Sequence, residues 1–455
     1  MKRSSAATGF GASVASLTHI ADGLARHLLS GEWTRETLTD RVRDYLGTRG
    51  KRAQHFLVLY LLTHAPDYPP SHARLAWLLM QLDYLNRIVG GSRSKRSPVQ
   101  PVADPPVFSP AKQYRGLDVP QIAAEGDLAG WLGLGVGQML WLADTRRRHG
   151  EEAVPVMQNY TYTFLPKRSG GLRLVEAPKA RLKAAQRQIL RGILDIVPAH
   201  DACHGFVRGR SCLTGAALHA GEQIVLCMDV ADFFPSTSAA RVHVLFRRLG
   251  YPHAVTRVLT GLCTTMTPRT AFDRAPDPSA FDWEARKRYG APHLPQGSPT
   301  SPALANLVAR VLDARLGGLA RKVSARYTRY ADDLTFSGGP EFEEALRWFP
   351  EAVARVLRDE GWRANPAKTR TMRQSSAQVV TGIVVNQHLN VRREDYDALK
   401  AILFNCLRTG PLAQNRESEP DFRAHLDGRV AWVGGVNPLR GRKLRVLFDQ
   451  VDWSA

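Results

Sequence analysis

The spacing of apolar residues divides the chain into two helical ends and a mixed middle part. Up to about residue 90, apolar residues recur with the 3.6-residue period of amphipathic helices. The last helix predicted there has Ser71 as its N-cap, directly after two prolines, and ends at Gly90 and Gly91. After Asn390 the helical period returns. The residues on the returning apolar stripe are Tyr396, Leu399, Ile402, Leu403 and Cys406.

The middle of the chain contains short apolar runs that are typical of strands. Tyr160–Pro166 and residues 172–176 flank a turn that contains two glycines, which predicts a β-hairpin. Ile224–Val230 is almost entirely apolar and predicts a buried strand. Arg326–Tyr330 and residues 334–337 are joined across three residues and predict a second hairpin.

Two helices are predicted between these strands. Residues 238–249 have a helical pattern, and Gly250 is the expected stop. Ser301 and Pro302 are the expected N-cap and first residue of a long helix. The apolar face of this helix comprises Leu304, Leu307, Val308, Val311, Leu312, Leu316 and Leu319.

These patterns divide the chain into four segments. We expect a helical N-terminal extension over residues 1–89 and a mixed α and β part over residues 113–386. Between them, residues 90–112 are dense in Gly, Ser and Pro without an apolar period, which predicts a linker. Residues 387–455 form the helical C-terminal segment.

The charge of the chain points to a polyanionic partner. The 62 Lys and Arg residues outnumber the 42 Asp and Glu residues, giving a net charge of +20 and a pI near 10.1. A protein this basic most often meets nucleic acid. Hydrophobic residues at 44% and charged residues at 23% exclude wholesale disorder.

Cysteine usage and hydropathy suggest a cytoplasmic protein. The 5 cysteines form no CxxC pair, so we expect neither a disulfide framework nor a structural zinc site. The longest stretch without a charge, residues 128–143, is too short to span a bilayer. The residues after Met1 lack the apolar core of a signal peptide. We therefore predict no membrane association.

Two carboxylate features are candidates for catalysis. Asp229 lies near the end of the apolar strand, and Asp332 and Asp333 occupy the tip of the second hairpin. A carboxylate on a buried strand is costly unless a cation such as Mg²⁺ neutralises it. If the two features lie on adjacent strands, they would hold two ions about 3.5–4 Å apart, the arrangement that promotes in-line phosphoryl displacement. The alternative is a simple Asp-Asp turn and a strand-end cap.

Two further features suit a nucleotide. Residues 294–302, LPQGSPTSP, place a glycine-bearing loop before a helix N-terminus, where free backbone amides suit a phosphate. Lys167 and Arg173 flank the tip of the first hairpin, where two cations could bind a triphosphate. The alternatives are a proline-rich turn and solvated surface cations.

Six motifs in order resemble the reverse transcriptases, and within them the bacterial retron enzymes that make branched RNA–DNA (msDNA), of the myxobacterial type. The resemblance extends from about residue 160 to residue 386, with a weaker match onward to about residue 438. The motifs are YTFLPKRSGGLRLVEAPK, HGFVRGRS, MDVADFFPS, LPQGSPTSP, YADD and GWRANPAKTR.

The resemblance implies an α+β right-hand polymerase that copies RNA into DNA. Residues 113–386 would form the fingers and palm, with an antiparallel sheet in the palm, and residues 387–455 a helical thumb. The enzyme would use two Mg²⁺ ions, bound by Asp229, Asp332 and Asp333, and deoxynucleoside triphosphates as substrates.

The resemblance also implies roles for single residues. Lys368 matches the lysine proposed to protonate the leaving pyrophosphate, and Phe234 matches the bulky residue that screens the sugar 2′ position. Gln296 would touch the incoming nucleotide, and Lys167 and Arg173 its triphosphate. The alternatives are a surface lysine at position 368 and a core phenylalanine at position 234.

Two short patterns point to retron enzymes. Val380, Thr381 and Gly382 match the family's Val-Thr-Gly. The family's Asn-Ala-x-x-His reads Gly215-Ala-Ala-Leu-His219 here, so the Asn is absent. The residues expected to bind RNA or primer are Arg208, Arg210, His219, Val380, Thr381, Gly382, Arg429, Arg442 and Lys443. For the thumb cations the alternative is a solvated basic helix face, and for His219 an ordinary helix histidine.

The implied partners are a cognate structured non-coding RNA, its cDNA product and an effector protein in anti-phage defence. The segment after residue 387 leaves no room for an RNase H domain, so we expect a separate enzyme to remove template. One alternative is another defence-associated or group II-like reverse transcriptase with different priming. The other is a catalytically silent RNA-binding scaffold, which has no need of three carboxylates.

Overall fold

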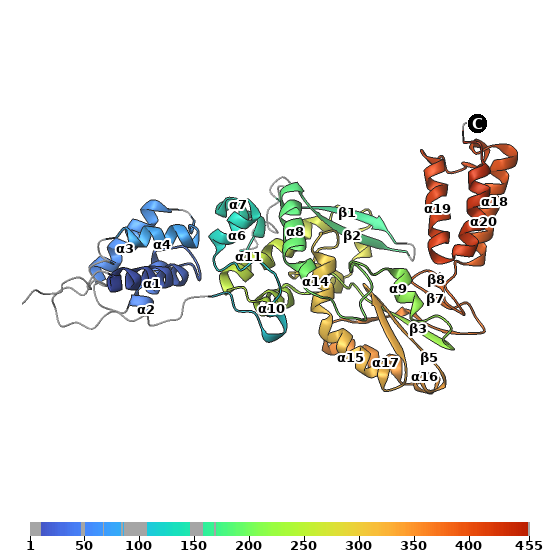
Figure 1. Ribbon diagram of the computed structural model, residues 1–455, viewed down its shortest axis with the longest axis horizontal. Helices are drawn as coiled ribbons and strands as arrows, with labels where there is room; N and C mark the ends of the chain where they lie inside the picture. Colours follow the sequence, from blue (N-terminus) through green and yellow to red (C-terminus); the bar gives the residue numbers. More distant parts are fainter. Residues whose placement is uncertain are drawn as a thin grey trace, which may run out of the picture. The chain divides into compact units, whose positions relative to one another are not determined.

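The computed structural model of the chain describes residues 11–46, 51–66, 68–82, 85, 107–145, 158–167 and 170–453. The chain, shown in Figure 1 with colours that follow the sequence, divides into two compact units. The first comprises residues 1–198 and 237–304, and the second residues 199–236 and 305–455. Most of the predicted linker, and the helix end expected at Gly90 and Gly91, lie outside the described residues.

The first unit begins with helices that share one apolar core. They are α1 (Gly11–Leu28), α2 (Arg35–Leu46), α3 (Lys51–His64) and α4 (His72–Met80). Leucines from the four helices, among them Leu24, Leu38, Leu61 and Leu79, are fully buried together. The predicted N-cap is confirmed, because the Ser71 hydroxyl accepts a hydrogen bond from the backbone of the first turn.

The rest of the first unit consists of a hairpin surrounded by helices. The hairpin strands β1 (Tyr160–Pro166) and β2 (Leu172–Pro178) pair antiparallel, as predicted. The α-helices are α6 (Glu125–Leu132), α7 (Val136–Ala143), α8 (Ala180–Gly192), α10 (Ala239–Leu249), α11 (His253–Cys263), α12 (Arg269–Phe272) and α13 (Trp283–Gly290). The 3₁₀ turns are η1 (Lys112–Tyr114), η2 (Leu194–Ile196) and η3 (Pro278–Ala280). The α10 helix ends at Gly250, with φ of 112°, as predicted.

The second unit is built on a four-stranded antiparallel sheet. Its strands are β3 (Ile224–Val230), β4 (Arg326–Tyr330), β5 (Asp333–Gly338) and β6 (Ala364–Arg373). The order is β4-β5-β3-β6, so the most apolar strand, β3, is internal and pairs on both sides. The helices α9 (Cys212–Ala217), α16 (Pro340–Ala345) and α17 (Phe349–Asp359) belong to the same unit.

The long helix predicted from Ser301 is interrupted. Ala309 leaves the helical conformation, with ψ of 0°, and separates α14 (Ser301–Val308) from α15 (Arg310–Arg321). The predicted apolar face is also wrong at Val311, which is 49% exposed. Instead, α15 turns the fully buried Asp313 inward to pair with Arg329, and this orientation leaves Val311 in solvent.

The C-terminal helices pack around a second apolar core. They are α18 (Arg393–Thr409), α19 (Phe422–Val436) and α20 (Pro438–Gln450), with η4 (Leu412–Gln414) after the first, and Figure 1 shows them side by side. The predicted stripe is confirmed, because Tyr396, Leu399, Leu403 and Cys406 are buried. This core extends to the short hairpin of β7 (Val379–Val380) and β8 (Ile383–Val384). No helix among the described residues is long and apolar enough to cross a membrane.

Candidate functional site

Asp229 is the carboxylate of the internal strand β3. It lies directly opposite Asp333 of β5 and opposite Asn365 of β6. Its relative exposure is only 4%, so its charge needs partners inside the protein. Lys368 Nζ donates to Asp229 Oδ1 at 2.8 Å, and Asn365 Nδ2 donates to Oδ2 at 3.1 Å.

The other two predicted carboxylates lie at the turn between β4 and β5. Tyr330 pairs with Asp333, which makes Ala331 and Asp332 a two-residue hairpin turn. Ala331 has φ of 56°, the left-handed conformation that tight hairpin turns require. The Val230 backbone N–H donates to the Asp332 carbonyl oxygen at 2.9 Å, which fixes the turn to the end of β3. The structure thus brings Asp229 and the turn together, although about a hundred residues separate them in the sequence.

The three carboxylates repel one another. The pKa of Asp333 is raised to about 6, first by partial desolvation and then by the negative charges of Asp332 and Asp229, against the opposing effect of Lys368 and Arg370. The Asp333 side chain is solvent-exposed. Of the two causes, the repulsion among the three carboxylates is therefore the one that a bound ligand would change. A hard divalent cation, which prefers oxygen ligands, would relieve it.

The donor set fits Mg²⁺ by charge and by ligand type. One oxygen of this set is already engaged, since Lys368 Nζ contacts Asp229 Oδ1 at 2.8 Å. Across the described ranges, no three carboxylate, imidazole or thiol groups are arranged to hold one metal ion. An ion bound by this oxygen of Asp229 would therefore compete with Lys368.

An irregularity in β6 allows Lys368 to reach Asp229. Cys227 pairs with Arg370 and Asp229 pairs with Asn365, so the single residue 228 of β3 faces the four residues 366–369 of β6. Extra residues in one strand bulge outward and redirect their side chains. Here the bulge turns Lys368 back over the strand, and its side chain remains 50% exposed.

The contact keeps Lys368 charged. Burial alone would lower the pKa of Lys368, but the hydrogen bond and charge of Asp229, followed by the charges of Asp332 and Asp333, raise it overall. Lys368 therefore holds its proton at neutral pH, next to the carboxylate on the internal strand. That is the state in which it could later donate the proton.

A buried arginine, which the sequence analysis missed, supports the turn that carries Asp332. Arg329 is fully buried on β4, and its guanidinium makes a bidentate ion pair with Asp313 of α15, at 2.7 Å for both contacts. Its Nη1 also donates to the Ala331 carbonyl oxygen at 3.1 Å, inside the turn. The position of the Asp332 backbone thus depends on a charge two residues before the turn.

The same guanidinium connects the turn to the HGFVRGRS segment. Arg329 Nη1 donates to Asn306 Oδ1 at 2.9 Å, and Asn306 Nδ2 donates to the Gly205 carbonyl oxygen at 2.8 Å. A side chain at Gly205 would lie 2.7 Å from the Ala331 backbone nitrogen, so only glycine fits there. One sequence feature could have revealed this network. Arg329 is a charged residue inside a strand pattern, and Asp313 is an acidic residue on a mostly apolar helix.

Phe234 is held against a buried aromatic pair. Phe233 is 4% exposed and stacks on Trp362, with ring centroids 5.9 Å apart. The Phe234 ring lies 5.6 Å from the Phe233 ring and is only partly buried. Phe233 is therefore the core residue of the two, and Phe234 keeps an accessible surface.

The predicted nucleotide-binding cations belong to the first unit. Lys167 follows β1 and Arg173 lies in β2, and both are exposed. Residues 168–169, at the tip between them, lie outside the described residues.

The loop that carries Gln296 is attached to β2 of the same unit. The Gln296 carbonyl oxygen accepts from the Glu176 N–H at 2.8 Å. Gly297 has φ of 136°, and an added side chain would lie 2.9 Å from the Glu176 carbonyl oxygen. The buried Glu176 carboxylate also binds His293 Nε2 at 2.9 Å. Burial alone would lower the pKa of His293, but the Glu176 charge raises it overall, so the pair anchors the loop electrostatically.

The two predicted arginines of the HGFVRGRS segment differ in availability. Arg208 is exposed. Arg210 Nη1 donates to the carbonyl oxygens of His200, Asp201 and Cys203, at 3.0, 2.9 and 2.8 Å. These contacts give Arg210 a structural role in closing the preceding loop.

Gly215 replaces the family asparagine at a tightly packed position. It is buried in α9, and an added Cβ would lie 3.3 Å from the Cβ and Cγ atoms of His204. His204 Nδ1 bonds to the Thr214 hydroxyl at 2.9 Å, and burial followed by the Arg210 charge lowers its pKa. The imidazole of His204 thus fills the space next to position 215.

Two of the predicted RNA-binding residues are inside the protein. His219 is fully buried, and its two ring nitrogens bond to the hydroxyls of Ser337 and Thr328, at 2.7 Å each. Val380 is 1% exposed and belongs to the C-terminal core. The expectation that these two side chains touch RNA is wrong for this structure, because no part of either reaches the surface.

The rest of the Val-Thr-Gly pattern forms the turn between β7 and β8. Thr381 and Gly382 have φ of 46° and 87°. Left-handed conformations at both turn residues are those of a type I′ hairpin. Gly382 is exposed and Thr381 half-buried, so the turn presents these two residues while Val380 anchors it.

The predicted RNA-binding cations of the C-terminal helices also differ in exposure. Arg442 and Lys443 are exposed on α20, and Arg429 is half-buried on α19. Two neighbouring arginines make contacts within these helices: Arg440 lies over the Tyr396 ring, and Arg445 pairs with an aspartate of α19 at 2.6 Å.

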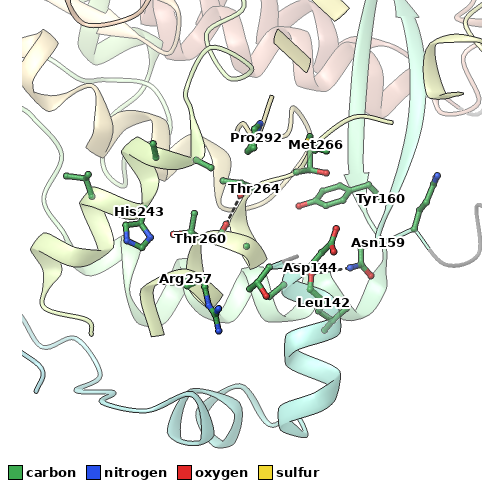
Figure 2. Close-up of a pocket in the computed structure, with 18 of the residues that line it drawn as sticks. Leu142, Asp144, Asn159, Tyr160, His243, Arg257, Thr260, Thr264, Met266 and Pro292 are labelled. Atoms are coloured by element: carbon green, nitrogen blue, oxygen red, sulfur yellow. Dashed lines mark hydrogen bonds between the residues drawn. The ribbon is translucent and has the colours of Figure 1, made fainter. Parts of the chain in front are cut away.

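A cavity of about 460 Å³ lies within the first unit and is shown in Figure 2. Most of its polar lining groups already bond within the protein. Asn159 Nδ2 donates to the Leu142 carbonyl oxygen at 3.1 Å, and Thr264 donates to the Thr260 carbonyl oxygen at 2.8 Å. None of the predicted site residues lines this cavity.

Comparison with known proteins adds independent information. Residues 165–386 match the family model described as reverse transcriptase (RNA-dependent DNA polymerase). The chain is 40% identical over 335 residues to the retron Mx65 reverse transcriptase of Myxococcus xanthus, covering 73% of each chain. It is 35% identical over 343 residues to the retron Mx162 reverse transcriptase of the same organism, covering 72% of this chain and 67% of the relative.

Two more distant matches complete the comparison. The retron Ec86 reverse transcriptase of Escherichia coli is 33% identical over 285 residues, which cover 62% of this chain and 77% of the relative. Among solved structures, telomerase from Candida albicans in complex with a TWJ fragment of telomeric RNA matches with a TM-score of 0.35 and 10% identity, covering 64% of this chain and 56% of that chain. At that TM-score the likeness supports no argument about this protein.

Proposed function

Since this chain belongs to the retron reverse transcriptases and is an RNA-directed DNA polymerase with an α+β right-hand fold, we propose that it copies a structured non-coding RNA of its own into branched RNA–DNA, the msDNA. The product serves anti-phage defence in the cytoplasm together with an effector protein, and a separate RNase H removes template. The retron relatives and the Val-Thr-Gly turn support the retron product, and the family resemblance alone supports the defence role.

The observation that carries the catalytic proposal is the pairing of Asp229 with Asp333 beside the Asp332 turn. We assign two Mg²⁺ ions to these three carboxylates, where they would stabilise charge on the attacking and leaving oxygens. In the reaction, a primer hydroxyl oxygen forms a bond to the α-phosphorus of a deoxynucleoside triphosphate and loses its proton. The bond between that phosphorus and the pyrophosphate oxygen breaks.

The protein's own residues take the remaining tasks. Lys368 donates a proton to the departing pyrophosphate, a role supported by its charge and its contact with Asp229. Phe234 meets the sugar 2′ position with the accessible part of its ring. In the first unit, Lys167 and Arg173 bind the triphosphate, and Gln296 contacts the nucleotide.

Primer and RNA are bound by residues that remain accessible. These are Arg208, Arg429, Arg442, Lys443, Thr381 and Gly382. His219, Val380 and Arg210 act indirectly, by shaping the segments that carry them.

The proposal is tested by the nucleic acid that copurifies with the protein from its native host. We expect one short cDNA of fixed sequence, joined at its 5′ end to the 2′-oxygen of an internal guanosine of one RNA. Debranching enzyme should release that DNA, and the Asp333→Asn variant should yield the RNA without DNA. Heterogeneous cDNA with no 2′,5′ linkage would identify a reverse transcriptase with different priming.

A further inference from the structure

Helix α8 of the first unit presents one strongly basic face. Lys183, Arg187 and Arg191 follow one another at intervals of four residues, and all three are exposed. Arg181 and Ala184 are also exposed on this helix. The opposite face is buried through Leu182, Ala185, Gln186 and Ile189. The helix is thus fixed in the protein by one face and presents cations on the other.

These cations have no carboxylate partner in the described part of the chain. The helix itself carries no acidic residue, and no ion pair between described residues involves Arg181, Lys183, Arg187 or Arg191. Other exposed arginines behave differently: Arg315 of α15 pairs with Asp359 and Glu360, at 2.6 and 2.8 Å. Unpaired cations on a rigid element keep their full charge for an external anion.

The spacing suits a polyanion rather than a single anion. Residues four apart on a helix are separated by about 6 Å along its axis. Each step of four residues turns the side chain by about 40° around the axis, so Lys183, Arg187 and Arg191 form a slanted row. Ala184 lies beside this row, three residues before Arg187, and its short side chain is exposed.

The composition of the exposed face excludes two other kinds of partner. Ala180 and Ala184 are its apolar residues, so it lacks the large side chains that insert into a lipid bilayer. It also lacks the exposed aromatic anchors that carry protein–protein affinity. A row of cations without such anchors matches the backbone of a nucleic acid.

We propose that the α8 basic face, Lys183, Arg187 and Arg191, binds the phosphate backbone of the RNA partner. The inference rests on the proposed function, because that function supplies the RNA. Binding of this kind is independent of sequence and depends strongly on salt. It assigns an RNA-contact role to a helix for which neither the motifs nor the comparisons give one.

The test measures RNA binding without catalysis. A fluorescein-labelled RNA hairpin with a single-stranded tail is titrated with protein in EDTA at several salt concentrations. We expect the Lys183→Gln, Arg187→Gln, Arg191→Gln triple variant to bind severalfold more weakly at every salt concentration. Each lost phosphate contact lowers the slope of log affinity against log salt by about one, so the triple variant should lose about two to three.

A matched triple variant controls for net charge. Arg315→Gln, Arg355→Gln, Arg358→Gln removes the same charge, but Arg315 and Arg358 are paired with carboxylates in the protein. We expect this variant to keep the wild-type affinity and salt slope. An equal loss in both triples would show that only total charge matters and would overturn the proposal.

A substitution beside the row of cations gives a second, independent readout. Ala184→Glu places a carboxylate among the cations on an exposed helical position, and Ala184→Gln adds the same bulk without charge. We expect Glu to weaken RNA binding severalfold and Gln to have no effect. Equal binding by both variants would contradict the proposal even if a triple variant failed to fold.

The outcome separates this proposal from the proposed function. If wild-type protein extends an RNA-templated primer while the α8 triple binds RNA as wild type does, the basic face is not an RNA site and the polymerase function stands. If the triple loses binding but wild-type protein extends no primer, the RNA site stands and the polymerase proposal fails.

Discussion

Lys368 combines the properties that a general acid needs. It carries its proton at neutral pH, it contacts Asp229 directly, and half of its side chain remains open to solvent. A surface lysine without these contacts would lack the second property, the contact with Asp229. The structure therefore favours a role in the reaction over the alternative of a solvated residue.

Replacing Lys368 by Ala should slow catalysis. General acids contribute about 100-fold to 10,000-fold to a rate, and we expect a loss of kcat in that range with KM for the nucleotide little changed. Single-nucleotide extension rates across pH provide the measurement. The wild-type rate should fall at high pH as the lysine loses its proton, and the variant should lack that fall. A variant with wild-type kcat would exclude the assignment.

His219 has a structural task that makes stability depend on pH. Burial, followed by the charges of His204 and Arg326, lowers the pKa of His219 to about 3. An unfolded chain has a histidine pKa of about 6.5. Between pH 6.5 and about 3, His219 is protonated in the unfolded state but stays neutral in the folded state. The contribution of His219 to the free energy of unfolding is therefore complete above pH 6.5 and decreases as the pH falls toward 3.

The His219→Gln variant tests this dependence. At pH 7 we expect a loss of about 1–3 kcal/mol, because Ser337 and Thr328 lose well-placed buried partners. As the pH is lowered toward 4.5, the difference between wild type and variant should shrink, since only the wild type carries this histidine. Urea-unfolding midpoints at a series of pH values provide the comparison. A difference that stays constant or grows at low pH would show that His219 is not buried as a neutral group.

The sequence alone could indicate the candidate catalytic residues but not which residues are buried. Asp229 was recognisable because a carboxylate within an apolar strand is costly and calls for a cation. No comparable feature of the sequence indicates that His219 and Val380 are buried. The side chain of a histidine or a valine next to a surface motif can point into the core or toward solvent. Their burial follows from tertiary packing against β4, β5 and the C-terminal core.

At the scale of elements, the β4–β5 hairpin depends on α15. Arg329 pairs with Asp313 of that helix and also holds the Ala331 carbonyl oxygen. Both partners of the ion pair are fully buried. Losing one partner of a buried pair costs about 3–5 kcal/mol, because the other charge remains without compensation.

Substitutions at this pair should separate stability from positioning. We expect Arg329→Met or Asp313→Leu alone to lower the unfolding free energy by about 3–5 kcal/mol, and the double variant to recover most of that loss. The recovered double variant should still extend primers slowly, since the turn has lost the contact to Ala331. Thermal denaturation and kcat for extension are the two readouts. A stable double variant with wild-type kcat would limit the pair to a role in stability.

The patterns predicted regular elements better than irregular ones. The strand at Ile224–Val230, both hairpins and the apolar stripe of α18 are confirmed, because each has a clear apolar run, turn or helical period in the sequence. Strand β6 was missed, because its sequence, ANPAKTRTMR, lacks an apolar alternation. Its bulge, which orients Lys368, arises from pairing with β3 and has no local sequence indication.

At the scale of the whole molecule, the order of the motifs was the most informative feature. Family membership, the α+β right-hand fold and the RNA-directed DNA polymerase activity are confirmed by the relatives and the family model. The net charge of +20 predicted a polyanionic partner, but it could not show which cations are available. Arg210, Arg440 and Arg445 are engaged within the protein, whereas the α8 cations have no ion-pair partner among the described residues. The segment boundaries of the chain remain a prediction.

The central claim is that Asp229, Asp332 and Asp333 bind Mg²⁺ for nucleotidyl transfer. Extension of a DNA primer on an RNA template, measured with Mg²⁺ and in EDTA, tests it most directly. We predict Mg²⁺-dependent extension by the wild type and a loss of about 100-fold or more in each Asp→Asn variant at the three positions. Asp449→Asn, on the exposed surface of α20, should extend as the wild type does. Wild-type extension by any of the three variants, in a folded protein, would contradict the account.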